Sequence, residues 1–285
     1  MDLGFFTTGL LTGLREGVEA ALIVSIILAY LAKTGNQRYF GLIWVGAGAA
    51  IVLSVVIGLV LFNTVGGFEE PAEQIFEGFL MIIAAAVVTW MLFWMRRTAA
   101  NIKGELHAGV DRALANGGIF GLAALAFTAV IREGIETALF LMGQATAAGT
   151  EAMSTLIGAL VGLLIAVGIG YGLYRGARVI NLRTFFQWTG IALIFIAAGL
   201  LSHAVHELIE IGVITFGTGT AFDISGILSH EEGIGQFLRA ILGYTATPEV
   251  TTLVVHVTYL VIVLALYLRP AAPRAQRSSQ PQPAS

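Results

Sequence analysis

Cysteine is absent from this 285-residue chain. Its absence excludes disulfide bonds and thiolate metal ligands, so any metal ion would have to be bound by oxygen or nitrogen atoms. Charged residues are also scarce, because only 12% of the chain is Asp, Glu, Lys or Arg, whereas 57% is hydrophobic. A soluble domain could not cover its surface with so few polar side chains. The composition therefore predicts a protein that lies in a lipid bilayer.

Continuous apolar stretches recur along the chain, and each has about the 20 residues that a helix needs to cross ~30 Å of hydrocarbon. They lie near residues 5–31, 40–62, 74–95, 117–145, 153–174, 185–210 and 250–268. They do not alternate apolar and polar residues as half-buried strands would, and a backbone in lipid must form its hydrogen bonds within one segment. The sequence therefore predicts an all-α membrane protein with seven transmembrane helices in a single domain, residues 1–268.

Charged residues are distributed unevenly between the two sides of this predicted domain. If the spans alternate in direction, most of the 15 Lys and Arg residues fall on one side, and the preference of basic loops for the cytoplasm makes that side the inner one. The amino terminus is then outside and the carboxyl terminus inside, with an outer loop at 211–249. The polar tail at 269–285 is expected to be disordered in the cytoplasm. Most acidic residues between spans fall outside, where they would attract cations.

A short sequence occurs twice. REGVEAALIV at 15–24 recurs as REGIETALFL at 132–141, and each copy lies in the first of three consecutive spans. We therefore expect two three-helix repeats, at about 5–95 and about 117–210, followed by a seventh helix at 250–268. Because three is an odd number, the second repeat enters the membrane from the opposite side, an inverted arrangement typical of transporters. Substrate sites in such folds usually lie near the midplane, where corresponding helices of the two repeats meet.

Each copy carries one arginine and two glutamates on one face of a helix, since each residue advances about 100° around the axis. These residues are Arg15, Glu16 and Glu19 in the first copy, and Arg132, Glu133 and Glu136 in the second. An ionisable residue at the centre of a membrane helix costs about 2.5 to 3.5 kcal/mol on the insertion scale, so packing alone does not explain the motifs. One alternative is purely structural: each arginine forms an ion pair with the glutamate four residues later.

The structural alternative leaves a surplus of negative charge, because four glutamates face two arginines. A bound cation or protons must neutralise that surplus in a medium of low dielectric constant. Hard metal ions prefer carboxylate oxygen, and a chain without cysteine offers no ligand softer than His and Met. Iron therefore fits the predicted site better than copper(I).

Paired motifs of the form R-E-G-hydrophobic-E, in the first and fourth of seven predicted spans, resemble the oxidase-dependent iron transporter family. This family comprises the fungal high-affinity iron permeases and the bacterial EfeU-type iron permeases, and the resemblance extends from Phe5 to Leu268. It implies an iron permease of the cell (inner) membrane in which four residues handle the iron: Glu16, Glu19, Glu133 and Glu136. Arg15 and Arg132 would be their charge partners. We expect no catalytic site and no permanently bound cofactor, since iron is the substrate.

The resemblance also implies partners. Members of the family commonly work beside a periplasmic or extracellular ferroxidase or iron-binding protein, and the chain itself contacts membrane lipid. No oxidase site is evident in the sequence, and nothing in it indicates binding to nucleic acid.

Further acidic residues lie at the outer start of the third span. Glu70, Glu73 and Glu77 are spaced along one side of the predicted helix, after the break at Glu69-Glu70-Pro71. Glu70 and Glu73 would complement the positive end of the helix dipole, so their presence can be explained without a role in transport. Glu77 lies deeper in the span. We therefore predict that Glu77 belongs to an entrance route for the metal.

A stripe of possible ligands lies near the outer end of the sixth span, where His203, His206, Glu207 and Glu210 follow one another at helical spacing. Carboxylates at a helix carboxyl end oppose the helix dipole, and a cation would relieve that conflict. We therefore predict a metal-binding or proton-relay role for His206 and Glu207. Three other functions stay open: a proton-coupled carrier of another cation, an intramembrane metalloenzyme that uses the His206–Glu207 stripe, and a sensor that binds metal without transporting it.

Overall fold

The computed structural model describes residues 2–65, 72–98, 102–115, 119–176, 181–230 and 233–269. The fold of these residues is all-α, as predicted, and α1 to α9 follow in chain order. Their bounds are α1 Leu3–Lys33, α2 Phe40–Val65, α3 Ala72–Thr98, α4 Ile102–Ala115, α5 Ile119–Ala148, α6 Ala152–Tyr174, α7 Leu182–Glu210, α8 Gly233–Leu242 and α9 Val250–Leu268. Two short 3₁₀ turns, Gln37–Tyr39 and Gly149–Glu151, precede α2 and α6.

Several helices have the length and composition of membrane spans. Five stretches qualify among the described residues: Gln37–Thr64, Ala72–Arg96, Phe120–Tyr174, Leu182–Glu210 and Val250–Leu268. The third of them comprises both α5 and α6. The 31-residue helix α1 is long enough to cross a bilayer, but Arg15, Glu16 and Glu19 interrupt its apolar sequence. The chain is therefore a multi-pass membrane protein.

Two helices were not predicted from the sequence. The first, α4, has 14 residues and lies between the third and fourth predicted spans, where its one fully buried residue, Val110, packs with Leu31 and Leu122. The second, α8, has 10 residues and lies inside the expected outer loop at 211–249. Both are shorter than the apolar windows by which a span is recognised. The predicted tail at 269–285 lies outside the described residues except for Arg269.

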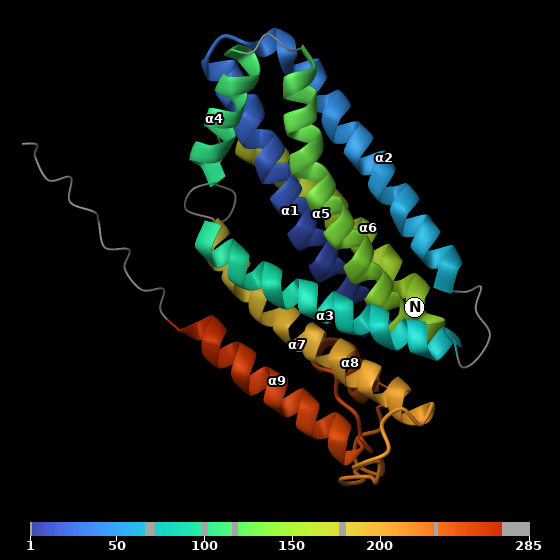
Figure 1. The fold of residues 1–285 in the computed structure, drawn as a ribbon. Helices are drawn as coiled ribbons and strands as arrows, with labels where there is room; N and C mark the ends of the chain where they lie inside the picture. The colour runs from blue at the N-terminus through green and yellow to red at the C-terminus, as the bar shows by residue number, and fades with distance from the viewer. Residues whose placement is uncertain are drawn as a thin grey trace, which may run out of the picture.

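The helices pack in two groups (Figure 1). In one group, α1 packs along α6 and α2 packs along α5; in the other, α3 packs on α7 and α7 on α9. Contacts of α5 with both α1 and α3 join the groups. A buried apolar core lies between α3, α7 and α9, and includes Met81, Leu193 and Tyr267. The two helices that carry the repeated motif, α1 and α5, thus lie side by side in the middle of the protein.

Glycines bring the backbones of α1 and α6 into direct contact. A Cβ atom on Gly9 or Gly13 of α1 would press into the α6 backbone at Thr155 or Ala159, and one on Gly162 of α6 would meet the α1 backbone at Leu10. Small residues four apart allow this close approach of helices in membranes. The contact fixes one side of α1 against α6, and leaves the side that bears the charged motif facing α5.

The glycine inside each motif has the same function. A Cβ on Gly17 would collide with Ala166 of α6, and a Cβ on Gly134 would collide with Ser54 of α2. Neither glycine breaks its helix, because α1 and α5 are continuous through the motifs. Glycine in the R-E-G-hydrophobic-E sequence therefore lets each motif helix pack closely on its neighbour, while the arginine and glutamates project elsewhere.

Candidate metal centre

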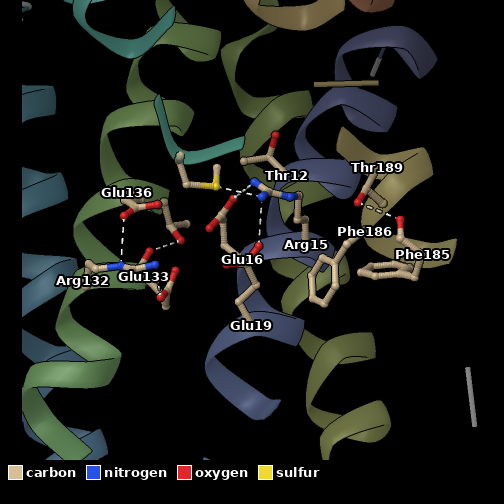
Figure 2. Close-up of polar contacts among 12 residues, drawn as sticks. Thr12, Arg15, Glu16, Glu19, Arg132, Glu133, Glu136, Phe185, Phe186 and Thr189 are labelled. Carbon is tan, nitrogen blue, oxygen red and sulfur yellow. Dashed lines mark hydrogen bonds and ion pairs between the residues drawn. The ribbon is translucent and has the colours of Figure 1, made fainter. Parts of the chain in front are cut away.

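The first motif is sealed inside the protein. Arg15 is 1% exposed, Glu16 is 1% exposed and Glu19 is 3% exposed. Arg15 Nη1 donates to Glu16 Oε1 at 2.9 Å, and Nη2 lies 3.0 Å from Glu19 Oε1. The same Nη2 donates to the Sδ atom of Met91 on α3 at 2.7 Å. One guanidinium therefore holds both glutamates of the motif, and α3 fixes its orientation (Figure 2).

The second motif repeats the pairing in a more open setting. Arg132 Nη2 lies 3.1 Å from Glu133 Oε1, and Nε lies 3.2 Å from Glu136 Oε1. The Arg132 guanidinium lies over the ring of Trp94 on α3, with its central carbon 3.8 Å from the ring centroid. The Arg132 side chain is 34% exposed, whereas both glutamates are buried. The two arginines thus differ in their surroundings, although the two sequences are nearly identical.

Carboxylates from the two motifs converge between α1 and α5. Ligand oxygens of Glu16, Glu19 and Glu133 all lie within 4.8 Å of one another, and all three side chains are buried. Figure 2 shows the two motifs pointing toward each other from their helices. Glu136 is not in this group, and its ion pair is with Arg132. The expectation that the motif helices meet is confirmed by this geometry, and the metal-binding role of these residues stays a prediction.

Several oxygens of this carboxylate cluster, by which we mean Glu16, Glu19, Glu133 and Glu136, lack hydrogen-bond partners. Among the described residues, no donor bonds to the buried Oε2 atoms of Glu16, Glu133 and Glu136. A buried polar atom without a partner costs about 1 to 3 kcal/mol, and more when it is charged. A hard cation or protons would satisfy these oxygens.

The structural alternative, an ion pair four residues apart in each motif, is present in the structure. Arg15 pairs with Glu19, and Arg132 pairs with Glu136. These pairs do not balance the charge, because each guanidinium also serves a second carboxylate with its single positive charge. The cluster therefore still holds more negative than positive groups.

The predicted stripe on α7 forms, and its histidines contact its glutamates along the helix. His203 Nε2 lies 3.5 Å from Glu207 Oε1, and His206 Nε2 lies 3.5 Å from Glu210 Oε1. The shortest contact of the group joins His206 Nδ1 to Glu249 Oε1 at 2.7 Å. His206 and Glu207, which were predicted to act together, have separate partners. Glu249 was missed, and its only sequence signal is its position directly before the last apolar stretch.

Glu249 lies at the end of the loop and precedes the first residue of α9. Desolvation by burial acts to raise the pKa of Glu249, but a backbone hydrogen bond and the contact with His206 outweigh it and hold the pKa below its usual value. Glu249 is therefore an anion at neutral pH. Its contact with His206 ties the start of α9 to the end of α7.

Two cavities lie at this end of the protein. The first has a volume of about 240 Å³, and its polar lining includes Thr8, Gln144, His206 and Glu249. The second has a volume of about 450 Å³, and its lining includes Glu77, Glu207 and His203. His203 lines both, so we treat the two together and call them the outer cavity, after the side on which the sequence predicts this end of α7 to lie. None of the four glutamates of the carboxylate cluster lines either part of it.

The outer cavity brings together residues that were predicted separately. Glu77 of α3 and Glu207 of α7 line the same part of it, which places the expected entrance residue beside the α7 stripe. Glu73 is half-buried in the first turn of α3. The predicted break at Glu69-Glu70-Pro71 lies outside the described residues. The arrangement provides imidazole and carboxylate groups that can bind a divalent cation.

Comparison with known proteins adds an independent finding. The model of the iron permease FTR1 family matches residues 7–274. The chain is 38% identical to the ferrous iron permease EfeU of Escherichia coli O6:H1 (strain CFT073) over 264 residues, which is 92% of this chain and 94% of the relative. It is 37% identical to the ferrous iron permease EfeU of Yersinia pestis over 267 residues, which is 93% of each chain. No solved structure matches the chain.

Proposed function

This chain belongs to the iron permease FTR1 family, and we propose that the iron it transports passes through the carboxylate cluster between α1 and α5. The observation that carries this proposal is the convergence of Glu16, Glu19 and Glu133, whose oxygens lie within 4.8 Å of one another. These groups are hard anionic ligands in a buried setting, and two arginines leave their charge incompletely balanced. Iron is the cargo in this proposal and is not a resident cofactor.

We propose seven transmembrane helices in the single domain 1–268: α1, α2, α3, α5, α6, α7 and α9. The 14-residue α4 and the 10-residue α8 are too short to cross ~30 Å of hydrocarbon. The helix contacts support two inverted repeats, because α1 packs along α6 as α5 packs along α2. Each motif helix therefore lies against the second helix of the other repeat. With basic loops inside, the amino terminus is outside and the carboxyl terminus is in the cytoplasm.

Ferrous iron is the redox state that we propose for the transported ion. The relatives from Escherichia coli and Yersinia pestis are named ferrous iron permeases. The carboxylates of the cluster suit Fe²⁺, and so do the carboxylates and imidazoles that line the outer cavity. Iron would collect in the outer cavity at Glu77, His206 and Glu207, bind in the cluster, and leave toward the cytoplasm across the inner membrane. A periplasmic or extracellular ferroxidase or iron-binding protein would deliver iron to the outer cavity.

Protons offer a way to release the ion, because they compete with a cation for the same carboxylates. We propose that proton entry into the cluster accompanies iron release. Uptake into proteoliposomes should then change when a pH gradient is imposed at constant iron concentration. Uptake that is indifferent to the gradient would count against proton coupling and would leave the iron site unaffected.

Radioactive iron uptake into proteoliposomes tests the central proposal. Glu19→Gln and Glu136→Gln should each reduce initial uptake by at least tenfold, with iron supplied either as Fe²⁺ under a reductant or as chelated Fe³⁺. Glu105→Gln is a matched control, because Glu105 is exposed on α4 and lines neither part of the outer cavity. Full uptake by both Glu19→Gln and Glu136→Gln would contradict the assignment of the carboxylate cluster as the iron site. A preference of the wild type for Fe³⁺ would overturn the proposed redox state alone.

A further inference from the structure

Gln144 is a buried polar residue on the motif face of α5. It follows Glu133, Glu136 and Phe140 at spacings of three and four residues, so these side chains form one stripe along the helix. Gln144 is 3% exposed, and its Nε2 atom donates a hydrogen bond to Thr12 Oγ1 at 2.8 Å. Its Oε1 atom has no hydrogen-bond partner among the described residues. Such an oxygen is costly to bury and needs an explanation.

The position of Gln144 explains why its oxygen is buried without a partner. Gln144 lines the outer cavity together with Thr8 and His206, whereas the glutamates of the cluster do not line it. Through its hydrogen bond Gln144 contacts Thr12, which is fully buried on α1 and precedes Arg15 by less than one helical turn. Gln144 therefore lies between the inner part of the cavity and the turn of α1 where the cluster begins.

We infer that Gln144 is a transit ligand, whose amide oxygen takes iron from the outer cavity and passes it to the carboxylate cluster. This inference rests on the proposed function. A neutral amide oxygen is a hard ligand that binds a divalent cation more weakly than a carboxylate does. Weak binding suits an intermediate position, because conduction needs sites that an ion can leave as well as enter. The hydrogen bond from Gln144 Nε2 to Thr12 orients the amide and leaves its oxygen available to the ion.

The test measures transport and binding separately. Gln144→Leu keeps the side-chain size and removes the oxygen, so initial Fe²⁺ uptake into proteoliposomes should fall at least tenfold. Equilibrium binding of Fe²⁺ to the purified protein in detergent should stay within twofold of wild type, because the cluster is intact. Gln187→Leu is the matched control, because Gln187 is exposed near the opposite end of α7 from His203 and His206. This control should transport at the wild-type rate.

A second variant distinguishes a ligand role of Gln144 from a purely structural one. Gln144→Glu retains an oxygen at the same position, so its uptake should clearly exceed that of Gln144→Leu, but it should stay below wild type because a carboxylate releases the ion more slowly. A purely structural amide would not be rescued in this way. Wild-type uptake by Gln144→Leu, or equal loss in Gln144→Leu and Gln144→Glu, would overturn the inference. Loss of iron binding in Gln144→Leu would overturn it too. A different result would contradict the proposed function itself: full uptake by both Glu19→Gln and Glu136→Gln.

Discussion

Arg15 and Arg132 occupy the same position in two nearly identical motifs, yet the Arg15 side chain is 2% exposed and the Arg132 side chain is 34% exposed. Arg15 is held by Met91, and Arg132 lies over Trp94. Both partners come from α3, which touches the two motifs at different points along its length. The two motifs of the carboxylate cluster therefore have nearly the same sequence but different surroundings.

This asymmetry predicts unequal effects of removing the two arginines. Arg15→Leu should lower the free energy of unfolding by about 3 to 5 kcal/mol, because it leaves two fully buried carboxylates without a positive partner. Arg132→Leu should have a smaller effect, because the Arg132 side chain is itself only partly buried, although Glu133 and Glu136 are also left without their arginine. Thermal unfolding of the detergent-solubilised variants, followed by circular dichroism, checks the order. A lower melting temperature for Arg132→Leu than for Arg15→Leu would contradict the described burial.

The contact between Arg132 and Trp94 predicts a modest electrostatic contribution. Trp94→Leu should cost about 0.5 to 1 kcal/mol of stability beyond the loss of apolar contact, as expected for a cation–π interaction at a partly exposed site. The matched control is Trp188→Leu, because Trp188 is 67% exposed on α7 and no interaction of its ring with a cation is found among the described residues. Double-mutant cycles with Arg132→Leu measure the coupling. Additive effects of the Trp94 and Arg132 variants would exclude the interaction.

Because α1 packs closely on α6, we predict that adding one methyl group in this contact lowers the stability of the protein. Gly13→Ala would drive a Cβ into the backbone of Ala159, so it should destabilise the protein by about 1 to 3 kcal/mol or force the helices apart. Gly168→Ala on α6 is the control, because a Cβ there meets nothing within 4 Å. It should be neutral, or stabilising by up to about 1 kcal/mol through helix propensity. Comparable melting temperatures for the two variants would argue against the described contact.

The contact of Glu249 with His206 predicts a dependence on pH. Because the pKa of Glu249 is lowered in the folded protein, its contribution to stability is present above the pKa of an unfolded glutamate, about 4.3, and is lost as the pH falls through the lower folded value. The melting temperature of the wild type should therefore fall more steeply below about pH 4 than that of Glu249→Gln. Melting temperatures of the wild type and Glu249→Gln are measured from pH 7 to pH 3. If the two fall in parallel, Glu249 does not contribute to the pH dependence.

Much of the fold could be predicted because the relevant signals are local. Apolar stretches marked the positions of seven long helices, and the repeated motif indicated that the two helices that carry it would meet. The partners Met91, Trp94 and Glu249 could not be predicted, since they reach the site from helices whose packing no local pattern specifies. Gln144 was missed for a related reason: one amide in an apolar helix has meaning only beside Thr12 and the outer cavity.

The glycine contacts between α1 and α6 also restrict how the protein can move. Helices whose backbones touch cannot slide past each other without a clash, so α1 and α6 must travel as one rigid body. The pair α2 and α5 is joined in a similar way, since a Cβ on Gly46 would strike the backbone of Ala123. Glu16 and Glu19 belong to the first body, and Glu133 belongs to the second. An ion held by all three would lock the two bodies together, and rocking them apart would dismantle its binding site.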